Sequence, residues 1–209
     1  MPHRIITTYV TETEIKFHWH GTAPEARALI EGRGYSVSSA RTLESDQLFD
    51  LPTAALRQSD RILRLRKTTS AEGTRHAMVT YKGPATRDIY KSREEIEFNV
   101  SDSDTFTLVL ERLGYQPVFR YEKYRTQLRL AGEPGVITID ETPIGIYMEI
   151  EGPQDWIDST AARLGLPKEQ FSTASYAALY REYKGQHPEA PADMTFDLDR
   201  TYTSGTKSP

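Results

Sequence analysis

The sequence predicts an α+β protein built on a mainly antiparallel β-barrel whose helices cover the outside. Several segments alternate charged and apolar residues with the period of two that is typical of β-strands. The predicted helices are short and amphipathic, as expected of helices that cover one surface of a sheet. Charged strands occur both before and after Val100, which suggests two halves that close one barrel.

The clearest alternating segment is residues 12–16, where Glu12, Glu14 and Lys16 share one face of a strand. A single strand of this kind is typical of any antiparallel sheet with one face in water. Repetition makes the pattern informative, because nearly every predicted strand carries it. The other charged segments are residues 64–66, 93–97, 123–125, 138–140 and 149–151.

The first half of the chain is predicted to contain four strands and two helices. A capping box formed by Thr22 and Glu25 starts a helix that ends near Gly32. A second short helix is expected at residues 53–58. The strands are expected at residues 12–19, 35–43, 62–67 and 77–82, with the last two forming a hairpin.

The second half begins with a strand over residues 91–100 and a helix capped by Ser101 or Asp102. Three further strands and two further helices complete the predicted fold. The strands are residues 118–130, 136–140 and 146–150, and the helices are residues 154–164 and 173–184. We expect residues 1–185 to form one domain and residues 186–209, rich in Pro, Asp and Thr, to form a mobile tail.

The composition excludes several functional classes. A formal net charge of −4 argues against nucleic acid or an acidic membrane surface as the main partner. The chain has no cysteine, which excludes disulfides, thiolate metal sites and cysteine nucleophiles and agrees with a reducing cytoplasm. It also lacks a signal peptide pattern and a membrane-spanning segment. We therefore expect a cytoplasmic protein, for which a homodimer is compatible with the sequence.

The charges on the strands are balanced. Seven basic residues stand against seven acids: Lys16, Arg64, Arg66, Lys82, Arg93, Lys123 and Arg125 against Glu12, Glu14, Glu95, Glu97, Asp140, Glu149 and Glu151. If these faces point to solvent, they carry no special chemistry. If they line the barrel interior, burial is very costly unless the charges pair, bind a metal or bind a charged ligand. A polyanion bound together with divalent cations would satisfy both sets of charges.

The segment Glu12-Thr13-Glu14-Ile15-Lys16 resembles the N-terminal ExExK signature of the CYTH superfamily, the triphosphate tunnel metalloenzymes. Further motifs follow in the order found in that superfamily, and the resemblance covers roughly residues 9–184. These motifs are residues 64–66, 81–84, 93–97, 123–125, Asp140, 149–151 and 175–176. This many motifs in the same order make a chance match improbable.

The resemblance implies an eight-stranded antiparallel tunnel that binds a linear triphosphate with Mg²⁺ or Mn²⁺. It implies that the phosphates are contacted by Lys16, Arg64, Arg66, Lys82, Arg93, Lys123 and Arg125, among which Lys16, Arg64 and Lys82 are predicted to be catalytic. It implies that the metal is bound by Glu12, Glu14, Asp140, Glu149 and Glu151. Glu95 and Glu97 are interpreted as supporting acids.

Within the superfamily, residues 113–119 and 122–125 look most like class IV adenylyl cyclases, as do residues 81–84 and 91–95. The reaction predicted from the resemblance is therefore the conversion of ATP to cyclic AMP and pyrophosphate. A triphosphatase acting on inorganic triphosphate or thiamine triphosphate is the alternative, because all branches need the same phosphate-binding strands. A non-catalytic module that binds polyphosphate or nucleotides is disfavoured because the acids are present. His18 and His20 share a strand face with Lys16, but no third histidine has suitable spacing for a metal site.

Overall fold

The computed structural model describes residues 8–196, with side chains described from Thr11 onward. Nine strands form one sheet: β1 (Thr8–Trp19), β2 (Ser36–Asp50), β3 (Ile62–Thr69), β4 (Arg75–Lys82), β5 (Thr86–Arg87), β6 (Lys91–Val100), β7 (Gln116–Arg129), β8 (Val136–Thr142) and β9 (Gly145–Glu151). The helices are α1 (Ala23–Glu31), α2 (Ala55–Gln58), α3 (Ser103–Arg112), α4 (Gln154–Leu164), the 3₁₀ helix η1 (Lys168–Gln170) and α5 (Tyr176–Gln186). No helix in this part of the chain is long and apolar enough to cross a membrane.

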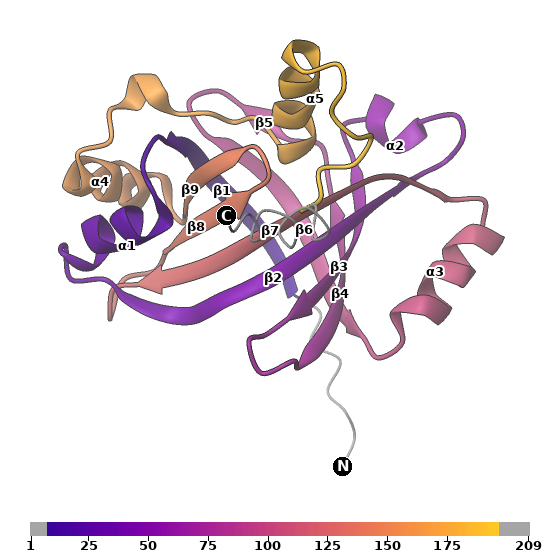
Figure 1. Ribbon diagram of the computed structural model, residues 1–209, viewed down its shortest axis with the longest axis horizontal. Helices are drawn as coiled ribbons and strands as arrows, with labels where there is room; N and C mark the ends of the chain where they lie inside the picture. Colours follow the sequence, from indigo (N-terminus) through magenta and orange to yellow (C-terminus); the bar gives the residue numbers. More distant parts are fainter. Residues whose placement is uncertain (1–7, 197–209) are drawn as a thin grey trace, which may run out of the picture.

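Eight of the strands close into an antiparallel barrel in the order β1-β9-β8-β7-β2-β3-β4-β6, because β6 also pairs with β1 (Figure 1). The short β5 lies outside this circuit and pairs with β6 alone. The helices lie outside the barrel, and α2 and α5 are at the end opposite the turn between β3 and β4 (Figure 1). The predicted fold class, an eight-stranded antiparallel barrel covered by helices, is confirmed.

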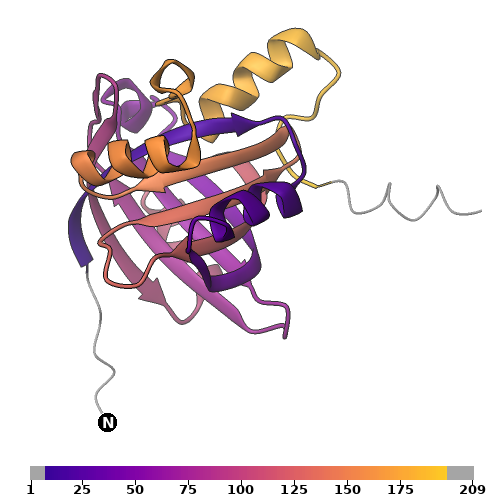
Figure 2. The same ribbon diagram turned by 90° about the vertical axis from the view of Figure 1, so that its left-hand side faces the viewer.

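The apolar core lies between the barrel wall and the helices rather than inside the barrel. Ile15 and Phe17 of β1 are 0% and 1% exposed and pack in a cluster with residues of α1 and α4. Figure 2 shows these two helices lying against the outer face of the sheet. A separate cluster joins Phe49 and Leu65 to Leu110 of α3. Because side chains alternate along each strand, outward apolar residues send their charged neighbours inward.

Local sequence signals explain how the covering helices begin and how closely they pack. The predicted capping box is present at α1, where the backbone N–H of Thr22 donates to Glu25 at 2.7 Å and the Thr22 side chain accepts in return. Helix α4 approaches the backbone so closely that a Cβ at Gly135 would lie 2.1 Å from the Trp156 ring. Glycine is therefore required at position 135 to seat α4.

Two element boundaries differ from the sequence-based expectation in a way that affects the site. Strand β2 does not end at residue 43 but continues to Asp50, pairing with β3 and β7 along most of its length. Helix α5 begins at Tyr176 rather than residue 173, with Ser175 as its N-cap. The longer β2 adds Glu44 and Asp46 to the barrel lining.

The prediction that the chain is a mobile tail from residue 186 needs correction for its described part. Gln186 ends α5, and the chain then returns to β7, where the N–H of Glu122 donates to the carbonyl of Met194 and the N–H of Met194 donates to Arg120. Met194 is fully buried among Tyr121, Tyr176 and Tyr180. β7 offers a free edge here because its pairing with β8 begins only at Tyr124. Residues 197–209 lie outside the described residues.

Replacing Met194 by alanine tests this packing. The substitution of this fully buried methionine by alanine is expected to lower the free energy of unfolding by about 2–5 kcal/mol. The control is Val118→Ala, at a position that is 57% exposed, for which a change within about 0.5 kcal/mol is expected. Urea unfolding measures both. If both substitutions had equal, negligible effects on the free energy of unfolding, the segment that contains Met194 would not pack against β7.

Asp60 connects the turn after α2 to β5 and gives a prediction about pH. Its carboxylate accepts two hydrogen bonds from Arg87 at 2.7 Å each and one from the N–H of Ala85 at 2.9 Å, which lowers its pKa to about 2. Since this pKa is below the ordinary value of 3.8, the ion pair of Asp60 with Arg87 stabilises the fold fully when the pH is above 3.8. This stabilisation is lost as the pH falls toward 2.

Asp60→Asn keeps a residue that tolerates the left-handed backbone at this position (φ 54°) but removes the charge. We expect the variant to be less stable by about 0.5–1 kcal/mol at pH 7, as for other solvent-screened ion pairs. The difference from the wild type should shrink between about pH 4 and about pH 2, measured by denaturant unfolding at each pH. A difference that stays constant down to pH 2 would contradict the assigned pair.

Candidate functional site

The barrel interior is lined by charge. Of the residues predicted for the site, Lys16, Arg64, Arg66, Arg93, Glu95, Lys123, Asp140 and Glu149 are buried. The side chains of Glu12, Glu14, Lys82 and Arg125 are between 12% and 17% exposed, Glu151 is partly buried and Glu97 is 30% exposed. The structure thus brings most of the predicted site residues together within one enclosed space. Arg93 is the exception, because its guanidinium donates to the carbonyls of Gly83 (3.0 Å) and Asp60 (2.9 Å) at the rim.

Sequence analysis missed three charged residues of this interior: Glu44, Asp46 and Lys91. All three are buried, and Asp46 is completely inaccessible. Glu44 and Asp46 repeat the acid-x-acid spacing of Glu12 and Glu14, and that spacing was the available signal. Lys91 lies two residues before Arg93 on the same strand face, so the period of two could have identified it.

Asp140 is the centre of the network on β7, β8 and β9. Its carboxylate accepts hydrogen bonds from Lys123 (2.8 Å), Arg125 (Nε, 2.7 Å) and the hydroxyl of Tyr176 (2.6 Å). Burial alone would raise the pKa of Asp140, but Arg125 and Lys123 outweigh it and keep this pKa below the usual value. Asp140 is therefore an anion whose hydrogen-bonding capacity is largely used by this protein's own cations.

Lys16 and Glu149 form a second fixed pair beside it. The Lys16 ammonium bonds the Glu149 carboxylate, which also accepts from Arg125. Lys16 also lies over the Tyr176 ring at 4.5 Å from its centroid, and Lys123 lies at 5.0 Å from the same ring. Helix α5 thus inserts one aromatic side chain between two of the cations and fixes where they can lie.

Strand β3 contributes two arginines that are held in different ways. Arg66 makes paired hydrogen bonds to Asp46 (2.8 and 3.0 Å) and an ion pair with Glu44 (3.0 Å). Arg64 donates to the Thr80 hydroxyl at 2.9 Å and lies 3.4 Å from Glu97, while its buried Nε has no hydrogen-bond partner within the described residues. Arg64 therefore keeps donor capacity for a bound ligand.

A different group of acids lies on β1, β6 and β9, with fewer partners. Lys82 bonds Glu12 and Glu95, and Lys91 bonds Glu14. Glu151 has no ion pair or hydrogen bond within the described residues, and burial together with the charges of Glu12 and Glu14 raises its pKa to about 7. Burial and the neighbouring Glu12 likewise raise the pKa of Glu95 to about 8. This part of the interior holds more carboxyl groups than cations to pair with them.

The donor chemistry of this acidic group fits a divalent cation, because Mg²⁺ and Mn²⁺ prefer carboxylate oxygen ligands. The unpaired Glu151 is the observation that supports the fit. Among described residues 8–196, no three His, Asp or Glu side chains already converge on one point at ligand distance. Glu12 and Glu14 are instead engaged by lysines, so these side chains would have to rearrange to bind an ion.

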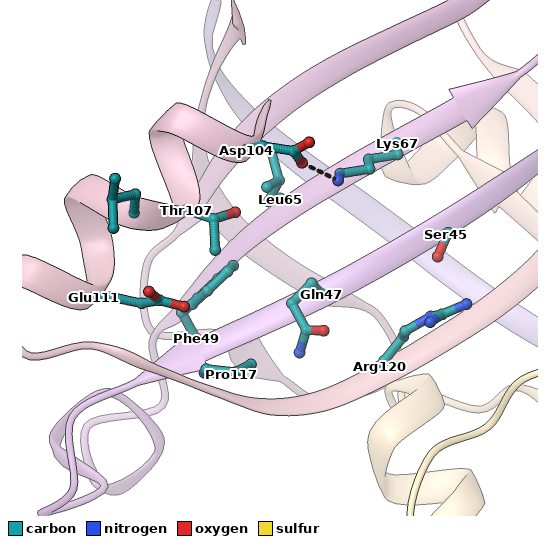
Figure 3. A pocket seen from close by; sticks show the side chains of 11 residues that line it. Ser45, Gln47, Phe49, Leu65, Lys67, Asp104, Thr107, Glu111, Pro117 and Arg120 are labelled. Atoms are coloured by element: carbon teal, nitrogen blue, oxygen red, sulfur yellow. Dashed lines mark hydrogen bonds and ion pairs between the residues drawn. The ribbon is translucent and has the colours of Figure 1, made fainter. Parts of the chain in front are cut away.

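A groove of about 490 Å³ lies outside the barrel, beside α3 (Figure 3). Phe49 and Leu65 line it, and Lys67 and Asp104 pair across its edge at 2.8 Å. Phe49, Leu65 and Lys67 are on the outward faces of β2 and β3, so the barrel wall separates the groove from the charged interior. The interior is therefore the candidate site.

Comparison with known proteins agrees with this geometry. Residues 11–178 match the CYTH domain family. A curated protein of Methanocaldococcus jannaschii, provisionally named an adenylate cyclase, is 29% identical over 112 residues, which are 53% of this chain and 60% of that protein. The matched region thus spans only about three fifths of the relative's length.

Two solved structures share the fold. A Vibrio parahaemolyticus protein, also provisionally named an adenylate cyclase, has a TM-score of 0.68 and 22% identity, covering 81% of this chain and 97% of that one. A Hippeastrum protein, described as a provisional adenylyl cyclase with a dominant triphosphatase activity, has a TM-score of 0.59 and 16% identity, covering 82% and 96%. At these identities the likeness concerns the fold alone, whereas the family match covers most of the chain, and the chain belongs to the CYTH domain family.

Proposed function

We propose that this protein is a divalent-metal-dependent enzyme that acts on a triphosphate inside the barrel, and that it converts ATP to cyclic AMP and pyrophosphate. The observation that carries the proposal is a closed barrel lined by seven basic residues. These are Lys16, Arg64, Arg66, Lys82, Lys91, Lys123 and Arg125. So many cations have no role in an ordinary hydrophobic core, whereas a linear triphosphate presents a row of anionic oxygens to bind them.

The arginines and lysines divide the binding of such a substrate. Arg64, Arg66 and Arg125 offer planar groups that can each donate two hydrogen bonds to one phosphate. Lys82 and Lys91 are point charges that currently bond Glu12 and Glu14. If these carboxylates turn to a metal ion, the lysines become free for phosphate oxygens. Metal and substrate are therefore expected to bind cooperatively.

Glu12, Glu14 and Glu151 are the residues that would hold Mg²⁺ or Mn²⁺ in this proposal. The metal would neutralise charge on the phosphate oxygens during an in-line attack at phosphorus. Asp140 and Glu149, which the resemblance also assigned to the metal, are each bonded to two basic residues. We infer that they orient Lys16, Lys123 and Arg125 toward the phosphates, where these cations stabilise the charge that develops in the transition state.

The choice of reaction depends on the nucleophile. Cyclisation uses the ribose 3′-hydroxyl at the α-phosphate, and the name of the M. jannaschii relative supports it. Hydrolysis of a terminal phosphate by water is the second candidate, and the activity described for the Hippeastrum protein favours it. A non-catalytic binding module would not need spare acids such as Glu151. The proposed compartment is the reducing cytoplasm, in agreement with the absence of cysteine.

The test is a product assay. Purified protein is incubated with ATP, inorganic triphosphate and thiamine triphosphate, each with Mg²⁺ and with Mn²⁺, and the products are resolved by chromatography. Metal-dependent formation of cyclic AMP and pyrophosphate is the expected result. Orthophosphate without cyclic AMP would establish the triphosphatase instead, and no conversion of any compound under either metal would contradict an enzymatic role.

Glu151→Gln separates metal binding from folding. The substitution removes one of several carboxylates crowded near Glu12, so the thermal midpoint should stay the same or rise. Metal-dependent turnover should fall about 100-fold, since loss of a metal ligand is at least as harmful as loss of its supporting partners. The matched control is Glu169→Gln, at an exposed position on η1, which should leave turnover unchanged. Wild-type turnover in Glu151→Gln would remove Glu151 from the metal site.

A further inference from the structure

Helices α2 and α5 lie at the same end of the barrel (Figure 1). Residues of both helices line a cavity of about 700 Å³, which we call the vestibule. Leu48, Ile62 and Phe119 contribute to its wall. Leu48 is two residues beyond Asp46, and Ile62 is two residues before Arg64, so the strand period places both on the interior face of the barrel. The vestibule therefore adjoins the charged interior at Leu48 and Ile62.

The charge around the vestibule is not balanced. Five basic residues line it, Arg57, Arg61, Arg87, Arg181 and Lys184, together with two acids, Asp50 and Asp60. Both acids are already engaged. Asp60 pairs with Arg87, and Asp50 accepts hydrogen bonds from the N–H groups of Leu51, Leu56 and Arg57 at 2.8, 2.9 and 3.0 Å. Four of the basic side chains thus have no acidic partner within the described residues, which favours an anion.

The wall of the same cavity is apolar and partly aromatic. The Phe119 ring lies between Tyr121 and Tyr180, with centroids 5.7 and 5.8 Å away in stacked orientations. Val118 beside it is 57% exposed and also lines the cavity. An apolar wall of this kind favours contact with a flat ring. Inorganic phosphate would leave this wall uncovered.

Building on the proposed function, we propose that the vestibule holds the organic part of the triphosphate substrate, and that it binds, more tightly than ATP itself, a nucleotide whose organic part combines a flat uncharged ring with an anionic group of its own. A nucleoside triphosphate that carries a further phosphate on its ribose has this chemistry. Thiamine triphosphate does not, because its cationic ring would lie among four unpartnered basic residues. Inorganic triphosphate has no group for the vestibule.

Equilibrium binding tests the proposal without depending on turnover. The probes are analogues of inorganic triphosphate, thiamine triphosphate, ATP and 2′-phospho-ATP in which methylene groups replace the bridging oxygens of the triphosphate. Such analogues cannot be cleaved, and calorimetry with Mg²⁺ then gives Kd for each. The 2′-phospho compound is expected to bind about five- to tenfold more tightly than the ATP analogue, the gain for two screened charge contacts. The thiamine compound should bind most weakly of the organic three.

The variant that isolates the vestibule is Arg181→Ala combined with Lys184→Ala. Both side chains are on α5, outside the interior network, so binding of the inorganic analogue should be unchanged while the gain from the 2′-phosphate disappears. The control is Arg33→Ala combined with Arg75→Ala, which removes the same charge from exposed positions away from the cavity. This control should keep the gain.

Two results would overturn the proposal alone: equal Kd for the ATP and 2′-phospho-ATP analogues, or a gain that survives in the Arg181, Lys184 variant. In both, metal-dependent binding of the inorganic analogue would persist and leave the proposed function standing. Failure of the proposed function has a different signature, because then no analogue, including the inorganic one, would bind with Mg²⁺ or Mn²⁺. That result would overturn the vestibule proposal as well.

Discussion

The constraint on which this structure depends is the burial of ions inside a closed barrel. Removing charges from water costs several kcal/mol per ion unless partners compensate for it, so almost every interior cation is bonded to an acid. The apolar residues that would normally form the core lie instead on the outside of the barrel wall, where α1, α3 and α4 cover them. The helices are therefore needed for folding, and the interior is left free for polar chemistry.

The interior acids differ in how many basic residues they pair with, and the functional interpretation rests on this difference. Around Asp140 and Glu149 each carboxylate bonds two basic residues, so the positions of Lys16, Lys123 and Arg125 are fixed. Around Glu12 and Glu14 each acid has one lysine, and Glu151 has none within the described residues. The raised pKa values of Glu95 and Glu151 result from burial and from the same crowding of carboxyl groups. A site that accepts a metal and a polyanion together would relieve it.

Helix α5 connects the interior to the end of the barrel. Tyr176 points inward to Asp140, and Tyr180, one turn later, packs with Phe119 and Met194. Arg181 and Lys184, further along the same helix, line the vestibule together with Tyr180. One helix thus positions interior cations through its first turn and presents charge to the vestibule through its last turns.

The alternation of charged and apolar residues in the sequence predicts the barrel and most of its lining. Wherever this alternation is present, as from Glu12 to Lys16, the period of two indicates which residues share a strand face. The prediction failed at Glu44 and Asp46, because their outward neighbours Ser45 and Gln47 are polar and line the groove beside α3, so no alternation marks the strand. It also failed at Met194, whose burial depends on a stretch of β7 that β8 leaves unpaired. The sequence does not predict which acids are paired or which segments meet at the vestibule. Both features depend on distances between strands and helices that are remote in sequence, so they are seen only in the folded protein.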